Sequence, residues 1–317
     1  MQEPFLTTQI ISTKKHTVRL WLRRILTLDT ALNENHYLPI FIIVVSILHI
    51  IIFLTTYLDV FWKEQPFAYS LRDLWMFFLP CMRPTSNNDR MVNITCGSSI
   101  HNWTCYYDDV LRNKCFSFLY PHQLWRLITV NFVHLSWLHL LFNISRQLLL
   151  GILLERKYGS MRIFLIYWIS NVGASLCFML INTQRPGIGA SGAVYGLLLF
   201  FIVERLSTMR MNPDQRIYIL IQLILLIVIP MAISLSTVAI LRVNTAHSAH
   251  FGGGLVGFLF GIGMFGCPCP WNNEYGCYQT ICRRTAYVLL VLYFIFTLSI
   301  FFLINAPYVD WIFYRIH

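Results

Sequence analysis

Three short runs of the sequence combine small residues with side chains that can act as nucleophile, base or hydrogen-bond donor. Ser191 lies in the run GIGASGAVYG, His250 in the run AHSAHFGG, and His139 and Asn143 in the run HLLFN. A serine is a poor nucleophile near neutral pH until a base removes its proton, and an imidazole with an unperturbed pKa near ~6.5 suits that task. The pattern predicts acyl transfer by Ser191, with His250 as its general base.

Amide cleavage also needs hydrogen-bond donors for the oxyanion of the tetrahedral intermediate. The backbone N–H of Ser191 at a helix N-terminus, the Asn143 amide and the His139 imidazole can supply them. Neither nearby carboxylate can complete a triad, because Glu204 follows Ser191 by thirteen residues, or about 20 Å along a helix, and Glu155 lies similarly far away at the other end of its segment. We therefore predict a serine–histidine dyad.

Each of these features also has a simpler interpretation. Glycines four residues apart, such as Gly253, Gly257 and Gly261, commonly indicate close helix packing. A serine among small residues often serves the same purpose, and a single histidine in an apolar segment is often only a hydrogen-bonded interior group. The elements that carry the residues must therefore decide between packing and chemistry.

Those elements are membrane spans. Of the 317 residues, 56% are hydrophobic and only 12% are charged, and the mean hydropathy is +0.58, which is typical of a polytopic membrane protein. A spanning helix needs about 20 mainly apolar residues. The predicted spans are 38–58, 136–154, 161–183, 190–207, 217–240, 246–266 and 285–305.

The second, fourth and sixth spans start from the same side of the membrane and therefore run parallel. The polar groups all lie in the first turns of these spans, so they share a depth of about 5–10 Å below the outer surface. This depth requires the second helix to begin near Ser136, which suits an N-cap. His139 and Asn143 are four residues apart and share a helix face. Three helices can thus direct polar side chains into one cavity.

Lysines and arginines indicate the orientation, because short cytoplasmic loops are enriched in them. They cluster in the N-terminal segment and after the second, fourth and sixth spans, which places the N-terminus in the cytoplasm. The formal net charge of +10 then reflects topology and attraction to anionic lipid rather than nucleic-acid binding. The expected parts are a cytoplasmic segment 1–37, a six-helix core 38–266 with a non-cytoplasmic loop 59–135, a cytoplasmic cysteine-containing loop 267–284, and a seventh helix with a short non-cytoplasmic tail, 285–317.

The loop 59–135 has the features of an oxidising compartment. Two N-x-S/T glycosylation sequons begin at Asn93 and Asn102. The four cysteines of the loop, which allow three connectivities and contain no C-x₂-C pair that would favour a metal, are Cys81, Cys96, Cys105 and Cys115. At the expected cytoplasmic end of the sixth span, Cys267 and Cys269 are candidates for palmitoylation, with unmodified reduced thiols as the alternative.

Taken together, the motifs resemble those of rhomboid proteases over about 120–266. The matching features are the run HLLFN at 139–143, the run GASG at 189–192 with Tyr195, the run AHFGG at 249–253, and Trp125-Arg126 before the second span. The resemblance implies an all-α polytopic fold with a six-helix core, here followed by one additional C-terminal transmembrane helix. It implies a Ser191–His250 dyad, an oxyanion hole lined by His139 and Asn143, a loop at Trp125-Arg126 lying partly in the membrane, and supporting positions at Gly189, Tyr195 and Gly253, with Tyr195 packed against the base.

The same resemblance implies an intramembrane serine endopeptidase. Its substrates would be single-pass membrane proteins in the lipid bilayer, cut near the outer end of the transmembrane helix after a small residue, so that the ectodomain is released. A seventh span after the core is typical of eukaryotic members of the secretory pathway, which implies the Golgi, the plasma membrane or endosomes. No metal or other cofactor is implied.

Two other classes of protein are compatible with parts of the sequence. A non-catalytic rhomboid-like trafficking or binding protein is the nearer one, although such relatives generally lack the serine or the histidine. A transporter is the other, since His247 and His250 share a helix face and His139 lies at a similar depth. His247 has no assigned role in the protease. Arg146, in the middle of the second span, departs from the family pattern at a costly place for a cation, and the sequence names no partner for it.

Overall fold

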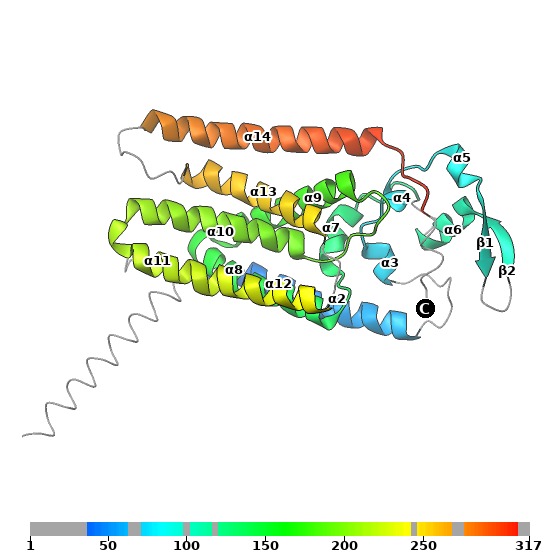
Figure 1. Cartoon of the computed structure of the whole chain (residues 1–317), viewed down its shortest axis with the longest axis horizontal. Coiled ribbons are helices and arrows are strands. Elements are labelled where there is room, and N and C mark those ends of the chain that lie inside the picture. Colours follow the sequence, from blue (N-terminus) through cyan, green and yellow to red (C-terminus); the bar gives the residue numbers. More distant parts are fainter. Residues whose placement is uncertain are drawn as a thin grey trace, which may run out of the picture.

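The computed structural model describes residues 37–62, 71–97, 102–115, 120–241, 246–267 and 276–309. Long helices run side by side, and short elements gather at one end of the bundle (Figure 1). In the described residues, seven helical segments are long and apolar enough to cross a membrane. The predicted all-α fold with seven spans is confirmed. The N-terminal segment 1–36 lies outside the described residues.

Six of the spans are single helices, namely α2 (Ile40–Trp62), α8 (Trp137–Tyr158), α9 (Ser160–Ile181), α10 (Ser191–Met211), α13 (His247–Phe265) and α14 (Gly276–Leu303). The fifth is composite: it joins η3 (Pro213–Gln215), α11 (Arg216–Leu223), a π-helical segment η4 (Ile224–Val228) and α12 (Ile229–Leu241). Helix α14 begins nine residues before the predicted start at 285. The prediction followed the apolar stretch, whereas the helix also includes the more polar turns that precede it.

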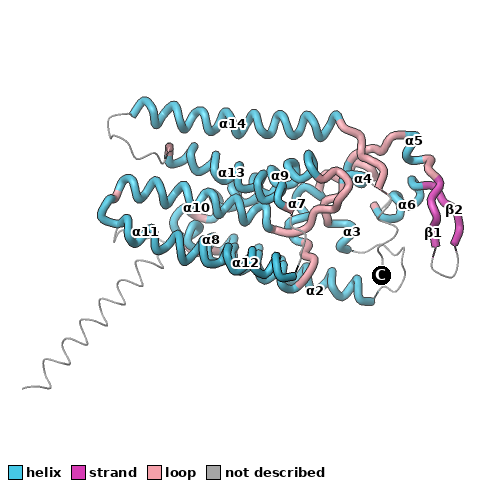
Figure 2. Tube along the Cα trace, viewed as in Figure 1, coloured by secondary structure: helices cyan, strands magenta, loops and turns pink. Residues whose placement is uncertain are grey.

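The short elements come mainly from the loop before the second span. They are α3 (Leu71–Trp75), α4 (Leu79–Met82), α5 (Asn87–Arg90), β1 (Asn93–Gly97), β2 (Asn102–Tyr106), α6 (Tyr107–Lys114), α7 (Arg126–Thr129) and η2 (Val130–Phe132). Strands β1 and β2 form an antiparallel hairpin, visible beside the helices in Figure 2. A disulfide joins Cys81 to Cys115, and Cys105 is also disulfide-bonded. Cross-linking stabilises a loop whose own apolar core is small.

Another disulfide corrects an expectation from the sequence. Cys267, at the end of α13, is bonded to Cys282 in the second turn of α14. Cys267 is therefore neither a free thiol nor available for palmitoylation in this structure. Cys269 lies outside the described residues. The sequence could not predict the pairing, because fourteen residues separate the two cysteines and only the packing of α13 beside α14 brings them together.

Helix α10 is the centre of the bundle. In its most apolar stretch, 72% of the residues are buried, compared with 17% in the fifth span and in α14. Helix α13 packs on it through facing glycines: a Cβ atom on Gly253 would overlap the carbonyl of Gly192, and one on Gly257 would overlap the carbonyl of Gly196. Such contact of backbone with backbone is how helices associate tightly in lipid. It places the first turns of α10 and α13 side by side.

The two carboxylates of α8 and α10 hold the bundle together away from those first turns. Glu155, in the last turn of α8, accepts hydrogen bonds of 2.8 Å from the backbone N–H groups of Phe41 and Ile42 at the start of α2. Negative charge is favourable at a helix N-terminus. Glu204 of α10 is bound by Lys157 at 2.6 Å and by Arg205. Both carboxylates therefore have structural partners.

Candidate active site

The first turns of α10 and α13 bring a serine and a histidine into contact. Ser191 is the first residue of α10, His250 is the fourth of α13, and the distance between His250 Nε2 and Ser191 Oγ is 2.9 Å. Ser191 is 9% exposed. If the proton of the imidazole is on Nδ1, Nε2 can accept the proton of the serine hydroxyl. This is the geometry that activates a serine as a nucleophile.

Tyr195 fixes the histidine ring. It lies one helical turn after Ser191, and its ring stacks on the His250 imidazole with centroids 4.2 Å apart and planes inclined by 7°. On its other end the Tyr195 hydroxyl points to Met231 Sδ at 3.8 Å. The stacking restricts His250 to the plane in which Nε2 faces the serine. The structure thus places Tyr195 in contact with His250.

The chain approaches Ser191 through a turn that needs glycine. Gly189 has φ +110°, a conformation that L side chains rarely adopt, and its N–H donates to the carbonyl of Val130 at 3.0 Å. Two residues earlier, Gly187 exchanges two backbone hydrogen bonds with Phe77, of 2.8 and 3.0 Å. These contacts tie the segment before α10 to the short elements of the loop, so the serine enters the helix at a defined position.

Helix α8 supplies a second set of polar groups beside this turn. Ser136 is its N-cap, as predicted, and accepts the N–H of His139 at 3.2 Å. A Cβ atom on Gly189 would lie 2.7 Å from His139 Nε2 and 3.6 Å from Asn143 Nδ2, so both side chains lie directly over the Gly189 backbone. Asn143 Nδ2 is buried and has no hydrogen-bond partner within the described part of the chain. Leaving a buried donor unpaired is costly, and such groups often mark a site that a ligand completes.

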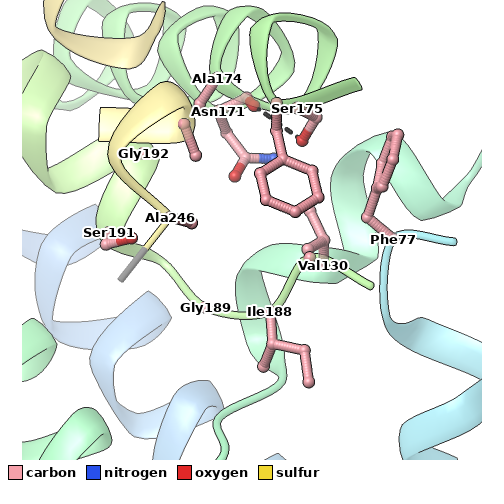
Figure 3. Close-up of a pocket in the computed structure, with 13 residues that line it drawn as sticks. Phe77, Val130, Asn171, Ala174, Ser175, Ile188, Gly189, Ser191, Gly192 and Ala246 are labelled. Atoms are coloured by element: carbon pink, nitrogen blue, oxygen red, sulfur yellow. Dashed lines mark hydrogen bonds between the residues drawn. The ribbon is translucent and has the colours of Figure 1, made fainter. Parts of the chain in front are cut away.

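Two cavities adjoin the pair. One, of about 30 Å³, lies between Ser191 and α9 and is lined by Gly189, Ala249, Phe178 and Ser175 among others (Figure 3). The other is a groove of about 340 Å³ beside His250, lined by residues of α10 and α13. Its remaining lining residues are mostly apolar: Tyr195, Leu199, Phe251, Gly254, Leu255 and Phe258. The small cavity holds about the volume of one water molecule, whereas the groove can hold large apolar side chains.

A buried polar network behind the site was not predicted from the sequence. Its centre is Asn131 in η2, which is bonded to His49 Nε2 at 2.8 Å and accepts the Tyr167 hydroxyl at 2.9 Å. Asn131 donates in turn to Asn171 at 3.1 Å. The available signal was the presence of polar residues within apolar spans, which must find partners there, but only the fold shows which ones meet.

His134, in the loop before α8, extends this network toward the site. Its ring lies 5.4 Å from that of His49 and 5.2 Å from that of His139, measured between centroids. Burial lowers the pKa of His134 well below its usual range, and the neighbouring His139 and His49 lower it further. The lowered pKa favours the neutral form of the ring, which packs against His139.

Arg126 fixes the loop that the resemblance placed partly in the membrane. It is fully buried at the start of α7, donates to the carbonyl of Met76 at 2.8 Å and to that of Asp73, and binds the Gln123 side chain at 2.8 Å. These bonds hold the segment before Phe77, which in turn pairs with the turn leading to Ser191. Arg126 thus acts on the site through the backbone of the loop.

His247 lies one turn before His250, and its ring meets that of His250 edge-on. Its ring centroid is 6.3 Å from that of His250 and the two rings are perpendicular. Gly253 has the packing role described above, and Gly189 allows the turn, so the two predicted supporting glycines act through the backbone.

The chain is thus a multi-span membrane protein. It has a polar site inside its helical bundle, where a serine and a histidine at the starts of two adjacent spans are hydrogen-bonded. A family model described as the Rhomboid domain matches residues 121–267, which include every residue of this pair and of the α8 set. This part of the chain is therefore similar to the Rhomboid domain.

Curated relatives show the same similarity. The chain is 34% identical over 189 residues to RHOMBOID-like protein 5 of Arabidopsis thaliana, covering 54% of this chain and 59% of that one. It is 29% identical over 149 residues to Rhomboid-related protein 2 of Mus musculus, covering 46% and 49%. A shorter match, 32% over 77 residues and covering 24% and 22%, is to Inactive RHOMBOID-like protein 8 of Arabidopsis thaliana. The matched part spans about half the length of the first two relatives.

Proposed function

We propose that this chain is an intramembrane serine endopeptidase. The observation that carries the proposal is the 2.9 Å contact between Ser191 Oγ and His250 Nε2, beside a buried Asn143 amide that has no partner among the described residues. Structural packing alone explains neither a histidine aligned on a helix-terminal serine nor an unpaired donor next to it. A peptide carbonyl placed between these groups would meet a nucleophile and an oxyanion donor at once.

The proposed reaction follows from these positions. His250 Nε2 takes the proton of Ser191 Oγ as the oxygen attacks the scissile carbonyl carbon, and the carbonyl oxygen becomes an oxyanion. Asn143 Nδ2, the Ser191 N–H and His139 donate hydrogen bonds to that oxygen. His250 then gives its proton to the leaving amine nitrogen, the C–N bond breaks, and a water activated by His250 hydrolyses the acyl-enzyme.

Labelling with a fluorophosphonate tests the proposal directly, because the reagent reacts with an activated serine hydroxyl. We expect one labelled serine, lost in Ser191→Ala and in His250→Ala. Ser175→Ala is a matched control, since Ser175 lines the same small cavity on α9 but its hydroxyl donates to the carbonyl of Asn171 at 3.1 Å. Labelling that persists in Ser191→Ala would refute the assignment. Absence of labelling in the folded wild-type protein would favour a non-catalytic protein, like the relative named inactive.

The substrate class that fits this site is a single-pass membrane protein. The groove beside His250 is apolar and the fifth span is only sparsely packed, so a transmembrane segment could reach the serine from the side. The 30 Å³ cavity next to Ser191 suits a small side chain before the scissile bond. Cleavage at the shallow depth of the first turns would release the ectodomain.

Reporter substrates with alanine before the scissile bond should be cleaved much faster than those with phenylalanine. Forcing a large side chain into a packed site costs about 1–3 kcal/mol, so kcat/KM should fall by roughly 5- to 150-fold. Phe178→Leu, which enlarges the cavity wall, should reduce this preference. Phe164→Leu, at an exposed position of the same helix, should not change it. An equal rate for alanine and phenylalanine reporters would place the specificity pocket elsewhere.

The proposed location is the secretory pathway or cell surface, with the N-terminus in the cytoplasm. We expect glycans on Asn93, which is exposed at the start of β1, and on Asn102. In cells, Asn93→Gln and Asn102→Gln should each remove one endoglycosidase-sensitive mobility shift. Asn182→Gln is the control, because no sequon begins there. A protein that carries no glycan on either asparagine would contradict the proposed orientation of this loop.

A further inference from the structure

Arg146 is an arginine in the middle of a membrane span, on the face of α8 that carries the site. It follows Asn143 by three residues and His139 by seven, spacings that keep all three side chains on one helix face. Its position is about 4.5 Å deeper along the helix than Asn143. The guanidinium lies within electrostatic reach of His139, Tyr195 and His250. Arg146 therefore places a positive charge beside the site on its deeper side.

No group of the described residues neutralises this charge. Arg146 Nη2 is buried and makes no hydrogen bond there. The carboxylates of α8 and α10, Glu155 and Glu204, are bound to the α2 N-terminus and to Lys157 with Arg205. Glu155 is also nine residues away, or about 13.5 Å along α8.

Among the described residues, the two fully buried arginines each bond to several partners, although Arg126 Nη2 is itself unbonded, whereas the part-buried Arg146 makes no hydrogen bond or ion pair there. Arg126 is bound by two backbone carbonyls and by Gln123, and Arg205 by Glu204 and Gln222. An intramembrane cation is costly and commonly marks a functional site, with its partner inside the bundle or in a cavity. For Arg146 the missing partner must come from outside the described structure.

We propose that Arg146 is a specificity-determining residue that binds an acidic side chain in the transmembrane segment of the substrate. This inference rests on the proposed protease function. A substrate whose scissile bond lies at Ser191 continues deeper into the membrane past Arg146. At about 3.3 Å per extended residue, a carboxylate two to five residues beyond the bond reaches the guanidinium.

Chemistry favours a carboxylate as the ligand. A guanidinium binds a carboxylate through two parallel hydrogen bonds, and the attraction between opposite charges is stronger in a low-dielectric site than in water. An acidic residue in a transmembrane helix is itself costly to insert, so few segments carry one. The pairing would therefore select a small class of substrates.

The test uses the full-length protein in liposomes with single-pass reporters. Aspartate or asparagine is placed at each of positions two to six beyond the cut site, on the side that continues into the membrane, and kcat/KM is measured for each. We expect wild-type protein to prefer aspartate about tenfold at one or two adjacent positions. Arg146→Gln should bring the ratio of aspartate to asparagine rates to about one, and Arg146→Lys should retain part of the preference. Arg162→Gln, an exposed arginine on α9, is the matched control and should keep the wild-type ratio.

A charge-reversed variant separates loss of charge recognition from loss of folding, because a misfolded protein would not gain a new preference. Arg146→Glu should prefer lysine over asparagine at the position where wild-type prefers aspartate. An aspartate-to-asparagine ratio near one at every position in wild-type protein, or a preference that survives Arg146→Gln, would overturn the inference. If no reporter is cleaved in a Ser191-dependent manner, the proposed function fails instead. Binding of the aspartate and asparagine reporters to Ser191→Ala protein then decides the role of Arg146 separately.

Discussion

Replacing Ser191 by alanine is expected to reduce cleavage of a transmembrane reporter to background. The substitution removes the only protein atom that bonds to the carbonyl carbon in the proposed mechanism, while leaving a side chain that fits the first turn of α10. In serine proteases, loss of the nucleophile lowers kcat on the order of 10⁶-fold. Cleavage by the variant should then fall below the detection limit.

His250→Ala should lower the rate to a similar extent, because the two residues act as a unit. The double variant should be no slower than either single one, since the first loss already prevents the proton transfer that the second residue takes part in. His247→Ala is the matched control on the same helix turn. Its ring is perpendicular to that of His250, with centroids 6.3 Å apart.

The measurement is cleavage of a tagged reporter in liposomes, with thermal unfolding of each variant recorded alongside. Ser191→Ala should keep the wild-type unfolding temperature to within a few degrees. Cleavage by a folded Ser191→Ala protein at more than a percent of the wild-type rate would show that another group is the nucleophile. A loss of cleavage caused by His247→Ala, with labelling of Ser191 intact, would move the base to the other histidine.

Much of the fold follows from the sequence because membrane spans are local features. A run of apolar residues defines each span whatever it packs against, so all seven spans were predicted. The start of α8 at Ser136 was predicted because a serine side chain can cap the first turn of a helix. The shared depth of Ser191 and His250 also follows from local information, because both begin parallel spans. Their hydrogen bond depends in addition on the glycine contact between α10 and α13.

Other parts depend on contacts between distant segments and could not be predicted. Arg126 donates to carbonyls about fifty residues earlier in the chain, and Asn131 joins His49 and Tyr167 across two other helices. Cys267 was expected to be palmitoylated or a reduced thiol because it lies at the end of the sixth span, but it forms a disulfide with Cys282. In each case the residue type indicated that a partner was needed, but the packing of helices decided which partner it met.

The buried amide of Asn143 gives the second large effect. We expect Asn143→Ala to lower kcat about 10²- to 10³-fold, which corresponds to about 2.7–4 kcal/mol of transition-state stabilisation. KM should change little, because in the proposed mechanism the amide binds an oxygen that carries charge only in the tetrahedral intermediate. In the free protein Nδ2 has no partner within the described residues, so alanine removes no ground-state hydrogen bond there.

The unfolding temperature of Asn143→Ala gives an independent test of the role of this amide. An unsatisfied buried donor destabilises the folded state, and alanine removes it at the cost of a small void. Asn143→Ala should therefore retain or slightly raise the unfolding temperature while it loses activity, the opposite of what a structural asparagine would show. Asn171→Ala is the matched control, since that amide donates to the Leu127 carbonyl at 2.8 Å and its loss should lower the unfolding temperature.

The kcat of His139→Ala shows whether His139 and Asn143 both bind the oxyanion or Asn143 binds it alone. Its Nε2 lies over the same Gly189 backbone as the Asn143 amide, so both can point at one oxygen. If they do, His139→Ala should also lower kcat, and the double variant should lose less than the product of the two single effects, because groups that bind one charge are not independent. A rise in KM at unchanged kcat for Asn143→Ala would instead assign the amide to substrate binding. In that case the oxyanion would have to be held by the Ser191 N–H at the start of α10 and by His139.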